Sequence, residues 1–347
     1  MKNFVVHLFS SYLQGVESRL YKEARYVLRN TICSEVVAIG FGKKGLVQEE
    51  TLPSGVHVFR IRTLLGNAPE KSLLRKYTIL RKLVALLSIL QYSWHAILLC
   101  RKLSPDHVSC HNALLLPVAW MASKVSSSRL QYVPHELETE KSGLNRVLKV
   151  LTKFVERIFI HSAVNVIVVC DPIAEFYQYK YGLKNLLVVP NIPSRDDIQV
   201  RALKDGGFRD IFNIPDSAKV FIYQGLISDG RGIRKLIESF SILNPTLHHL
   251  VLMGHCDKIF APLVRNWNYN IENVHYLPSV PADMITSYSA TADIGVNVSE
   301  CQSTSYRYAM GNKFYEWAHA GIPILVSQNL EYQANTLEEH EFGWSTQ

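Results

Sequence analysis

The sequence has few of the features that mark secreted, zinc-binding or membrane-spanning proteins. Its six cysteines are scattered along 347 residues and form no CxxC pair, which argues against a disulfide framework and a zinc site and fits a reducing cytosol. After Lys2, the first apolar run covers only residues 4–9, too short for a signal peptide. The chain is therefore expected to be cytoplasmic.

Nucleotide-binding and nucleic-acid-binding signatures are also missing. The chain contains no GxxxxGK[ST] loop and no GxGxxG fingerprint. No zinc finger or RNP-type strand accompanies its basic residues. Apolar residues make up 48% of the chain and charged residues 19%, which are the values of a globular protein long enough for two domains.

Positive charge is concentrated in the first third. Residues 1–105 hold 16 Lys and Arg against 6 Asp and Glu, whereas the net charge of the whole chain is +7. Nucleic acid, anionic lipid or a phosphorylated acceptor could each explain this excess. Because no nucleic-acid motif is present, an anionic membrane surface is the first choice of partner.

Residues 71–101 are the most unusual segment. A basic face formed by Lys71, Arg75 and Lys82 lies opposite apolar residues at helical spacing, the pattern of a helix lying in a membrane interface. Polar residues interrupt the apolar stretch 83–100, so a transmembrane helix is not expected. The alternative is a helix pair that packs on an N-terminal sheet, and both interpretations can hold together.

Apolar β-rich runs alternate with helical patterns along the whole chain. Seven predicted strands precede residue 192, at 4–9, 35–41, 56–61, 107–110, 130–134, 164–170 and 186–191. Five follow, at 220–224, 249–254, 273–277, 293–298 and 322–326. This alternation predicts two α/β domains of the Rossmann-like type, residues 1–191 and 211–347, joined by a polar linker at 192–210.

The stretch 220–240 is the strongest functional signal. A strand enters a loop containing Gly225, Gly230, Arg231 and Gly232, and an amphipathic helix follows. Such a loop presents backbone N–H groups and a positive helix end to a phosphate, and the guanidinium could clasp two phosphate oxygens. The alternative is a βα turn whose glycines serve only the turn geometry.

A second stretch, 311–327, predicts a short helix, a turn and a buried strand. Lys313 and Glu316 are three residues apart and share one helix face. The cation could serve a phosphate and the carboxylate a ribose, although a surface ion pair would give the same pattern. In the first domain, His111 and His135 follow predicted strands, where open parallel sheets bind ligands. A lone histidine there is more often structural.

In order and spacing, the motifs YQG…GRG…LI, NVHYLP, ADIGV and NKFYEW…AGIPILVS resemble the group 1 retaining glycosyltransferases, which have the GT-B fold. The N-terminal motifs PDHVSCHN, VPHELETE and VVPN extend the resemblance over nearly the whole chain. It implies two domains facing each other across a cleft and a nucleoside diphosphate sugar as donor. It also implies transfer to a hydroxyl with retention of configuration, a hexosyltransferase-like reaction.

The resemblance assigns roles to the candidate residues. Arg231 and Lys313 would stabilise the leaving diphosphate, Glu316 would hold the ribose, and His135 would contact the sugar. Gly225, Gly230 and Gly232 complete the donor site, and His111, Glu300 and Gly15 are further candidates. No DxD sequence is present, so neither a metal nor another cofactor is expected.

The chain departs from the family in three places. Many members carry a second glutamate eight residues before the one matching Glu316, where this chain has Tyr308, and Glu300 is the nearest upstream carboxylate. Many place an arginine where this chain has Leu226. Members usually continue beyond the point matching Gln347, so the second domain is expected to be incomplete or finished differently.

The resemblance also implies a cellular role. The acceptor is expected to be a lipid-linked saccharide in surface polysaccharide synthesis, and the protein peripheral at the inner face of the membrane. A sugar-nucleotide epimerase or phosphorylase on the same fold, and a non-catalytic membrane-associated binding protein, are the alternatives. The sugar, the base and the linkage do not follow from the sequence.

Overall fold

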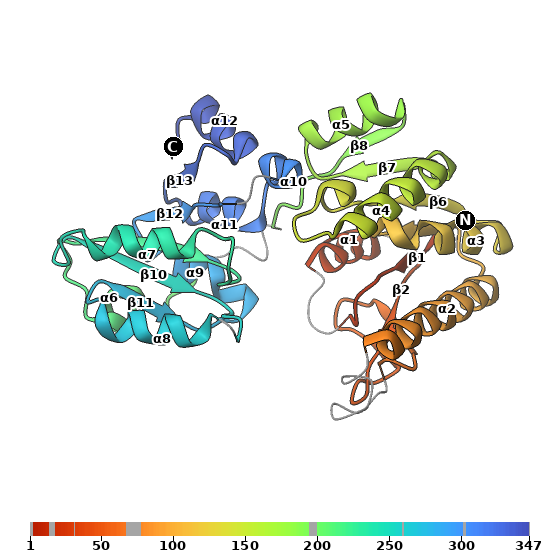
Figure 1. The fold of residues 1–347 in the computed structure, drawn as a ribbon, viewed down its shortest axis with the longest axis horizontal. Coiled ribbons are helices and arrows are strands. Elements are labelled where there is room, and N and C mark those ends of the chain that lie inside the picture. The colour runs from red at the N-terminus through yellow and green to blue at the C-terminus, as the bar shows by residue number, and fades with distance from the viewer. Residues whose placement is uncertain are drawn as a thin grey trace. The chain divides into compact units, whose positions relative to one another are not determined.

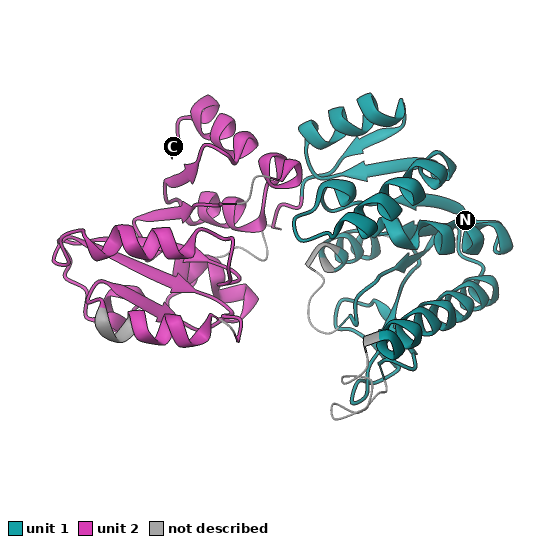
Figure 2. Cartoon of the chain, viewed as in Figure 1, with its two compact units in different colours: residues 1–190 teal, residues 191–347 magenta. Residues whose placement is uncertain are grey.

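The computed structural model describes residues 3–13, 18–30, 32–66, 78–193, 200–258, 260–300 and 303–346. The chain divides into two compact units, Met1–Pro190 and Asn191–Gln347 (Figure 2). Each unit is an α/β domain built on its own sheet (Figure 1). The predicted fold class, two parallel-sheet α/β domains, is confirmed.

The first unit contains an eight-stranded sheet in the order β3-β4-β2-β1-β5-β6-β7-β8. All neighbouring strands are parallel except the β3–β4 pair. The strands are β1 (Phe4–Leu8), β2 (Glu35–Gly42), β3 (Glu49–Thr51), β4 (His57–Arg62), β5 (His107–Cys110), β6 (Arg129–Tyr132), β7 (Asn165–Val168) and β8 (Leu186–Val188).

Five α-helices cross between these strands: α1 (Ser18–Arg29), α2 (Thr78–Leu103), α3 (Leu116–Val125), α4 (Arg146–Phe159) and α5 (Asp171–Tyr181). Short 3-10 turns cover Ala113–Leu115, Glu138–Glu140 and Ile160–Ser162. The steps β4 to β5, β5 to β6 and β6 to β7 run in one direction across the sheet, and β1 to β2 runs in the other. Right-handed crossovers therefore place α2, α3 and α4 on one face and α1 on the opposite face.

Helix α2 is one continuous helix within the described residues, not the helix pair that the sequence suggested. Its buried Tyr92 donates hydrogen bonds to the carbonyl oxygens of Phe9 (3.0 Å) and Ile39 (3.2 Å). The Tyr92 ring also stacks on Phe41, with 4.1 Å between ring centres. These contacts fix one side of α2 to the central strands, as the alternative interpretation of this segment expected.

The second unit has a six-stranded parallel sheet in the order β11-β10-β9-β12-β13-β14. Its strands are β9 (Lys219–Gln224), β10 (His248–Met253), β11 (Val274–Leu277), β12 (Ile294–Asn297), β13 (Ile324–Ser327) and β14 (Gly343–Thr346). Its helices are α6 (Phe208–Phe212), α7 (Ile233–Ser241), α8 (Ala261–Asn270), α9 (Ile285–Ser289), α10 (Thr304–Tyr308), α11 (Asn312–Ala320) and α12 (Glu331–His340), with a 3-10 turn at Ala282–Met284.

The predicted linker extends too far into the second unit. Residues 208–210 begin helix α6, where Phe208 is fully buried in the core of the second unit. Arg209 forms an ion pair with Asp293 (2.7 Å) beside the first residue of β12. Composition alone suggested a linker because the preceding residues are polar, whereas Phe208 and Phe212 attach the helix to the core.

Candidate functional site

A pocket of about 450 Å³ lies in the second unit, at the carboxyl ends of β9 and β10 and the start of α11. This is the edge at which open parallel sheets bind ligands. Four residues predicted for the donor site line the pocket together: Gly225, Arg231, Lys313 and Glu316. The structure thus places these four predicted residues around one cavity, although they come from two stretches that are far apart along the chain.

Two glycines let the strand-end loops approach closely. Gly225 follows β9 with φ 120°, and Gly254 follows β10 with φ 145°, backbone conformations that disfavour other residues. A Cβ on Gly254 would lie 1.9 Å from the Gly225 carbonyl oxygen. The Gly225 N–H donates to the Met253 carbonyl oxygen (2.9 Å). The wall of the pocket is therefore backbone at this point, and a ligand can approach it without meeting a side chain.

Lys313 stands on the first turn of α11 and is half-buried in the pocket wall. Its Nζ lies 4.4 Å from the centre of the Tyr223 ring. Burial, reinforced by the nearby positive charge of Arg231, lowers the pKa of Lys313 from 10.5 to about 7, and the negative charge of Glu316 opposes this only in part. An anion in the pocket would supply the missing negative charge.

Arg231 lies in the loop between β9 and α7 and lines the same pocket. Its guanidinium carbon is 5.6 Å from the centre of the Tyr306 ring. Burial raises the pKa of the Tyr223 hydroxyl to about 12, although the Arg231 charge acts in the opposite direction. At neutral pH the Tyr223 hydroxyl is therefore an uncharged phenol beside the Arg231 guanidinium and the Lys313 amine.

Glu316 is held by a hydrogen-bonded chain that the sequence did not reveal. Gln224, the last residue of β9, donates from Nε2 to the Glu316 carboxylate. Ser289 in turn donates to Gln224 Oε1 (2.7 Å). Gln224 is only 4% exposed, so its amide is fixed between these partners and orients the carboxylate. This arrangement suits a carboxylate that accepts hydrogen bonds from ligand hydroxyls.

Two glycines predicted for the donor site and the further candidate Glu300 do not line this pocket. Gly232 and Glu300 belong to a separate pocket of about 460 Å³, and Gly230 borders neither of the two. Gly232 caps α7 with φ 73°, and a Cβ there would meet Val298 at 3.0 Å, so a turn and close packing explain this glycine. Glu300 lies 3.3 Å from Lys235 Nζ and is 37% exposed. Glu300 therefore does not take the place of the missing family glutamate in this pocket.

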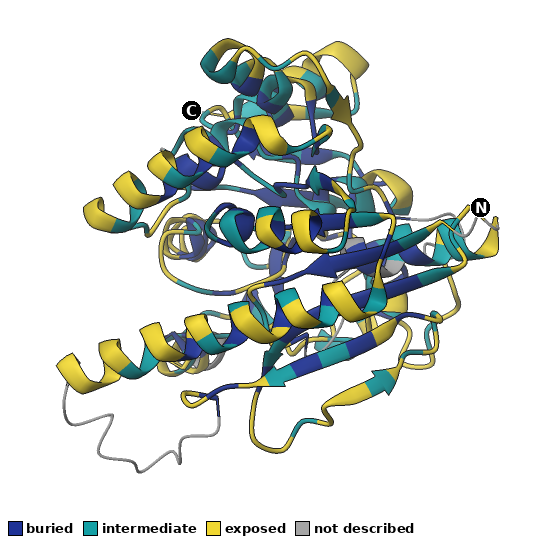
Figure 3. Cartoon of the chain, turned by 90° about the vertical axis from the view of Figure 1, so that its right-hand side faces the viewer, coloured by how far each residue is buried: buried dark blue, intermediate teal, exposed yellow. Residues whose placement is uncertain are grey.

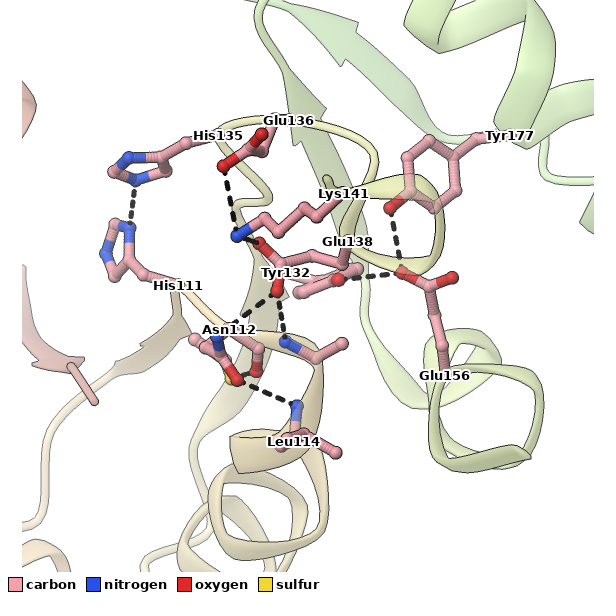
Figure 4. Close-up of polar contacts among 12 residues, drawn as sticks. His111, Asn112, Leu114, Tyr132, His135, Glu136, Glu138, Lys141, Glu156 and Tyr177 are labelled. Atoms are coloured by element: carbon pink, nitrogen blue, oxygen red, sulfur yellow. Dashed lines mark hydrogen bonds and ion pairs between the residues drawn. The ribbon is translucent and has the colours of Figure 1, made fainter. Parts of the chain in front are cut away.

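The two predicted histidines of the first unit are hydrogen-bonded to each other. His111 Nδ1 lies 2.9 Å from His135 Nε2, and His111 Nε2 lies 2.8 Å from His7 Nδ1 (Figure 4 shows the first of these contacts). The three residues come from the carboxyl ends of β1, β5 and β6. The His111 ring also stacks on Phe9 at 4.2 Å. His7 was not predicted because it sits inside an apolar run that indicates only a strand.

A carboxylate and a lysine lie beside these histidines. Glu138 accepts from Asn112 Nδ2 (3.2 Å), and its carboxylate pairs with Lys141 (2.5 Å), which also contacts Glu136 (3.2 Å) (Figure 4). Burial raises the pKa of Glu138, and Lys141 counteracts this shift. Ion pairs from Lys141 to Glu136 and Glu138 thus hold together the turn that follows His135.

Some predicted positions cannot be placed. Gly15, Lys71 and Arg75 lie outside the described residues. Lys82 is exposed near the start of α2. Tyr308, which stands where many family members carry a glutamate, is half-buried at the end of α10.

No family model and no curated protein sequence matches the chain. Several solved structures, however, are similar to it. Sucrose-phosphate synthase from Thermosynechococcus elongatus is similar with a TM-score of 0.72 and 15% identity, over 99% of this chain and 86% of that one. Anabaena HepE, solved in complex with UDP-glucose, is similar with a TM-score of 0.66 and 15% identity, over 99% and 85%.

A third similar structure is WaaG, a glycosyltransferase involved in lipopolysaccharide biosynthesis. Its TM-score is 0.63 with 14% identity, over 98% of this chain and 85% of that one. At this identity the likeness concerns the fold. The chain therefore has the GT-B fold that its sequence motifs predict.

Proposed function

We propose that this protein is a glycosyltransferase that moves a sugar from a nucleoside diphosphate sugar to a hydroxyl acceptor, with retention of anomeric configuration. The observation that carries the proposal is the pocket of the second unit, where Arg231, Lys313 and Glu316 converge on one cavity. Two cations suit a diphosphate, and the carboxylate suits a ribose. Among the similar structures, HepE was solved with UDP and with UDP-glucose, which makes a uridine nucleotide the first donor to test.

The two cations act on the leaving group. As the bond from the anomeric carbon to the phosphate oxygen breaks, negative charge develops on the diphosphate. Arg231 can form a two-pronged contact with phosphate oxygens, and Lys313 supplies a point charge. Because their positions are set by the fold, they stabilise this charge without reorganising, and no metal is needed in the proposal.

Retention follows from attack on the face that the leaving group vacates. The acceptor oxygen bonds to the anomeric carbon, the phosphate oxygen departs with the electron pair, and the acceptor proton passes to that oxygen. No protein nucleophile takes part. In the first unit, His135, anchored by His111 and His7, would contact the sugar.

The acceptor in this proposal is a lipid-linked saccharide of surface polysaccharide synthesis. It is supported by the basic first third of the chain and by the resemblance of the motifs to group 1 enzymes. The protein would then work at the inner face of the membrane.

The test is a panel of sugar nucleotides, each labelled in the sugar, incubated with the protein and a membrane fraction. Transfer of label into extracted lipid, with release of the nucleoside diphosphate, supports the proposal. An epimerase would change the sugar while it stays on the nucleotide. A binding protein would bind a donor without any release of the diphosphate.

A further inference from the structure

The helices α2, α3 and α4 of the first unit expose apolar side chains on the side that faces away from their sheet. On α2, the inward residues Tyr92, Ala96 and Cys100 are fully buried. The outward residues recur every three or four positions, so they form one stripe along the helix, and each is 40–64% exposed: Leu80, Leu83, Leu87, Leu90, Trp94 and Leu98. In Figure 3, α2 is the long helix that runs across the lower front of the view, and its outer side is exposed along most of its length.

Helix α4 repeats this arrangement. Its inward residues Thr152 and Glu156 are buried, and Glu156 accepts hydrogen bonds from Tyr132, Tyr177 and Tyr181. Its outward residues form a second apolar stripe and are 47–79% exposed: Val147, Val150, Leu151, Phe154 and Ile158. A helix of an ordinary soluble domain carries polar residues on this side.

The two stripes belong to one layer. Helix α2 packs against α3, and α3 packs against α4. The rings of Trp120 on α3 and Phe159 on α4 are 5.5 Å apart. Met121 and Val125 of α3 are also exposed and extend the apolar surface between the stripes. Apolar surface gathered on one side of a unit, rather than scattered, indicates an interaction site.

The charges of this layer have one sign. Apart from the buried Glu156, the three helices contain no acidic residue. Lys149 and Lys153 pair with Glu140 of the preceding turn (2.6 and 3.0 Å). The basic residues of the three helices are nine: Arg81, Lys82, Arg101, Lys102, Lys124, Arg146, Lys149, Lys153 and Arg157.

Three situations can be compared for this surface: α2 crossing a bilayer, a second copy of the chain, and a bilayer on which the layer lies. Residues 79–103 of α2 are long and apolar enough to cross a bilayer, and an 18-residue window within them has a mean hydropathy of 1.8. Crossing would, however, break the Tyr92 hydrogen bonds to Phe9, the residue after β1, and to Ile39 of β2. A second copy of the chain, docked through the same face, would bring like charges together. A bilayer with anionic headgroups needs neither change, because apolar stripes bordered by Lys and Arg suit its interface.

We propose that the α2–α3–α4 layer is a docking surface for an anionic lipid bilayer, on which the first unit lies without spanning it. The stripes enter the boundary between headgroups and acyl chains, and Trp94 and Phe154 act as the aromatic anchors. The inference does not depend on transfer activity, because it stands on the exposed surface of the first unit alone.

The test is co-sedimentation of the full chain with vesicles of phosphatidylcholine, with and without 30 mol% (about one third) phosphatidylglycerol. The parent should bind the anionic vesicles and bind phosphatidylcholine more weakly. The double variant Trp94→Gln/Phe154→Gln should lower the partition coefficient by roughly a hundredfold, since burying each large apolar side chain is worth about a factor of ten or more. Arg101→Gln/Lys102→Gln should lower it by roughly fivefold for each charge, only on anionic vesicles and mainly at low salt.

The matched control is Ile242→Gln/Trp344→Gln in the second unit, which removes apolar residues that are 85% and 56% exposed. This control should bind like the parent. The proposal is overturned if the parent does not bind anionic vesicles or if the α2–α4 variants bind as well as the control. It is equally overturned if the parent is a dimer that Trp94→Gln/Phe154→Gln converts to a monomer, because the face would then join two copies. Circular dichroism confirms that each variant is folded.

Discussion

The Lys313 ammonium lies 4.4 Å from the centre of the Tyr223 ring, in the wall of a pocket that Arg231 also lines. Lys313 is thus a cation in a partly desolvated position next to another cation, and its pKa falls to about 7. Its protonation and the binding of an anion are therefore linked.

We expect the binding of uridine diphosphate to take up a proton. Above pH 7 the free protein holds Lys313 mainly neutral, and the bound diphosphate restores the charge, so uptake at pH 8 should approach one proton per ligand. Above about pH 7, affinity should fall by up to roughly tenfold per pH unit. Calorimetry in buffers of different ionisation enthalpy measures the uptake. Lys313→Met should abolish it, and a variant that keeps full uptake would remove Lys313 from the diphosphate site.

The same pKa has a consequence for the stability of the free protein. The pKa of Lys313 is about 7 when folded and 10.5 when unfolded, so between these values the unfolded chain binds more protons. The contribution of Lys313 to the free energy of unfolding should therefore rise as the pH increases from 7 to 10.5. Denaturant titrations of the parent and Lys313→Met at several pH values check the sign. An identical pH dependence in both would contradict the assigned pKa.

Arg231→Ala should lower kcat more than it raises the KM for the donor. The charge on the leaving diphosphate grows toward the transition state, and the loss of one preorganised donor typically costs about 3 kcal/mol, or roughly a hundredfold in rate. Arg231→Lys should recover only part of the loss, because an ammonium cannot make the two-pronged contact. Steady-state kinetics at saturating acceptor separate the two parameters. Parental turnover in Arg231→Ala would mean that this arginine only packs on Tyr306.

Gln224→Leu should weaken donor binding through Glu316. The substitution leaves the carboxylate without its Gln224 partner and Ser289 without an acceptor in the side chain of residue 224. We expect the KM for a ribonucleotide donor to rise by roughly tenfold, the value of one hydrogen bond to a charged group. A 2′-deoxyribose donor should show a smaller difference between parent and variant, because the oriented carboxylate then has one ribose hydroxyl fewer to hold. Equal losses for both donors would argue that Gln224 supports the fold only.

Glu156 offers a test of the first unit that is independent of the donor site. Its carboxylate accepts hydrogen bonds from the hydroxyls of Tyr132, Tyr177 and Tyr181 and is fully buried (Figure 4 shows Tyr132 and Tyr177). Glu156→Leu should reduce the free energy of unfolding by about 3 kcal/mol, since three tyrosine hydroxyls, two of them on buried residues, lose their acceptor. Tyr177→Phe, which removes one donor, should cost about 1 kcal/mol. Denaturant unfolding measures the free energy of unfolding of both variants. An equal loss in Glu156→Leu and Tyr177→Phe would show that the three hydroxyls do not depend on the shared carboxylate.

The positions of most strands could be predicted because parallel strands that are buried on both faces have nearly continuous apolar sequences. Val36–Ile39 of β2 is an example, with every residue fully buried. The two strands that the sequence did not indicate, β3 with the sequence EET and β14 with the sequence GWST, lie at the edges of their sheets and are short and polar. Their pairing depends on the neighbouring strand rather than on their own composition.

Candidate-site residues could be predicted when they are charged and lie within a motif. They could not be predicted when their role depends on a partner that is distant in the sequence. Arg231, Lys313 and Glu316 could be recognised from the motifs around them. Gln224 and Gly254 could not, since a glutamine at a strand end becomes informative only when Glu316 is known to lie against it. The apolar stripe of α4 was also missed. The sequence pattern of an amphipathic helix is the same whether its apolar side faces a core or the solvent.

The most direct measurement is NMR observation of a reaction that contains the protein, a hydroxyl acceptor and the donor found in the labelled panel. Transfer with retention predicts one glycoside for every nucleoside diphosphate released, with the anomeric configuration of the donor, and loss of both products in an Arg231→Ala/Lys313→Met variant. Inverted configuration would contradict the same-face mechanism. A change of the sugar while it stays on the nucleotide, or donor binding without any released diphosphate, would contradict glycosyl transfer itself.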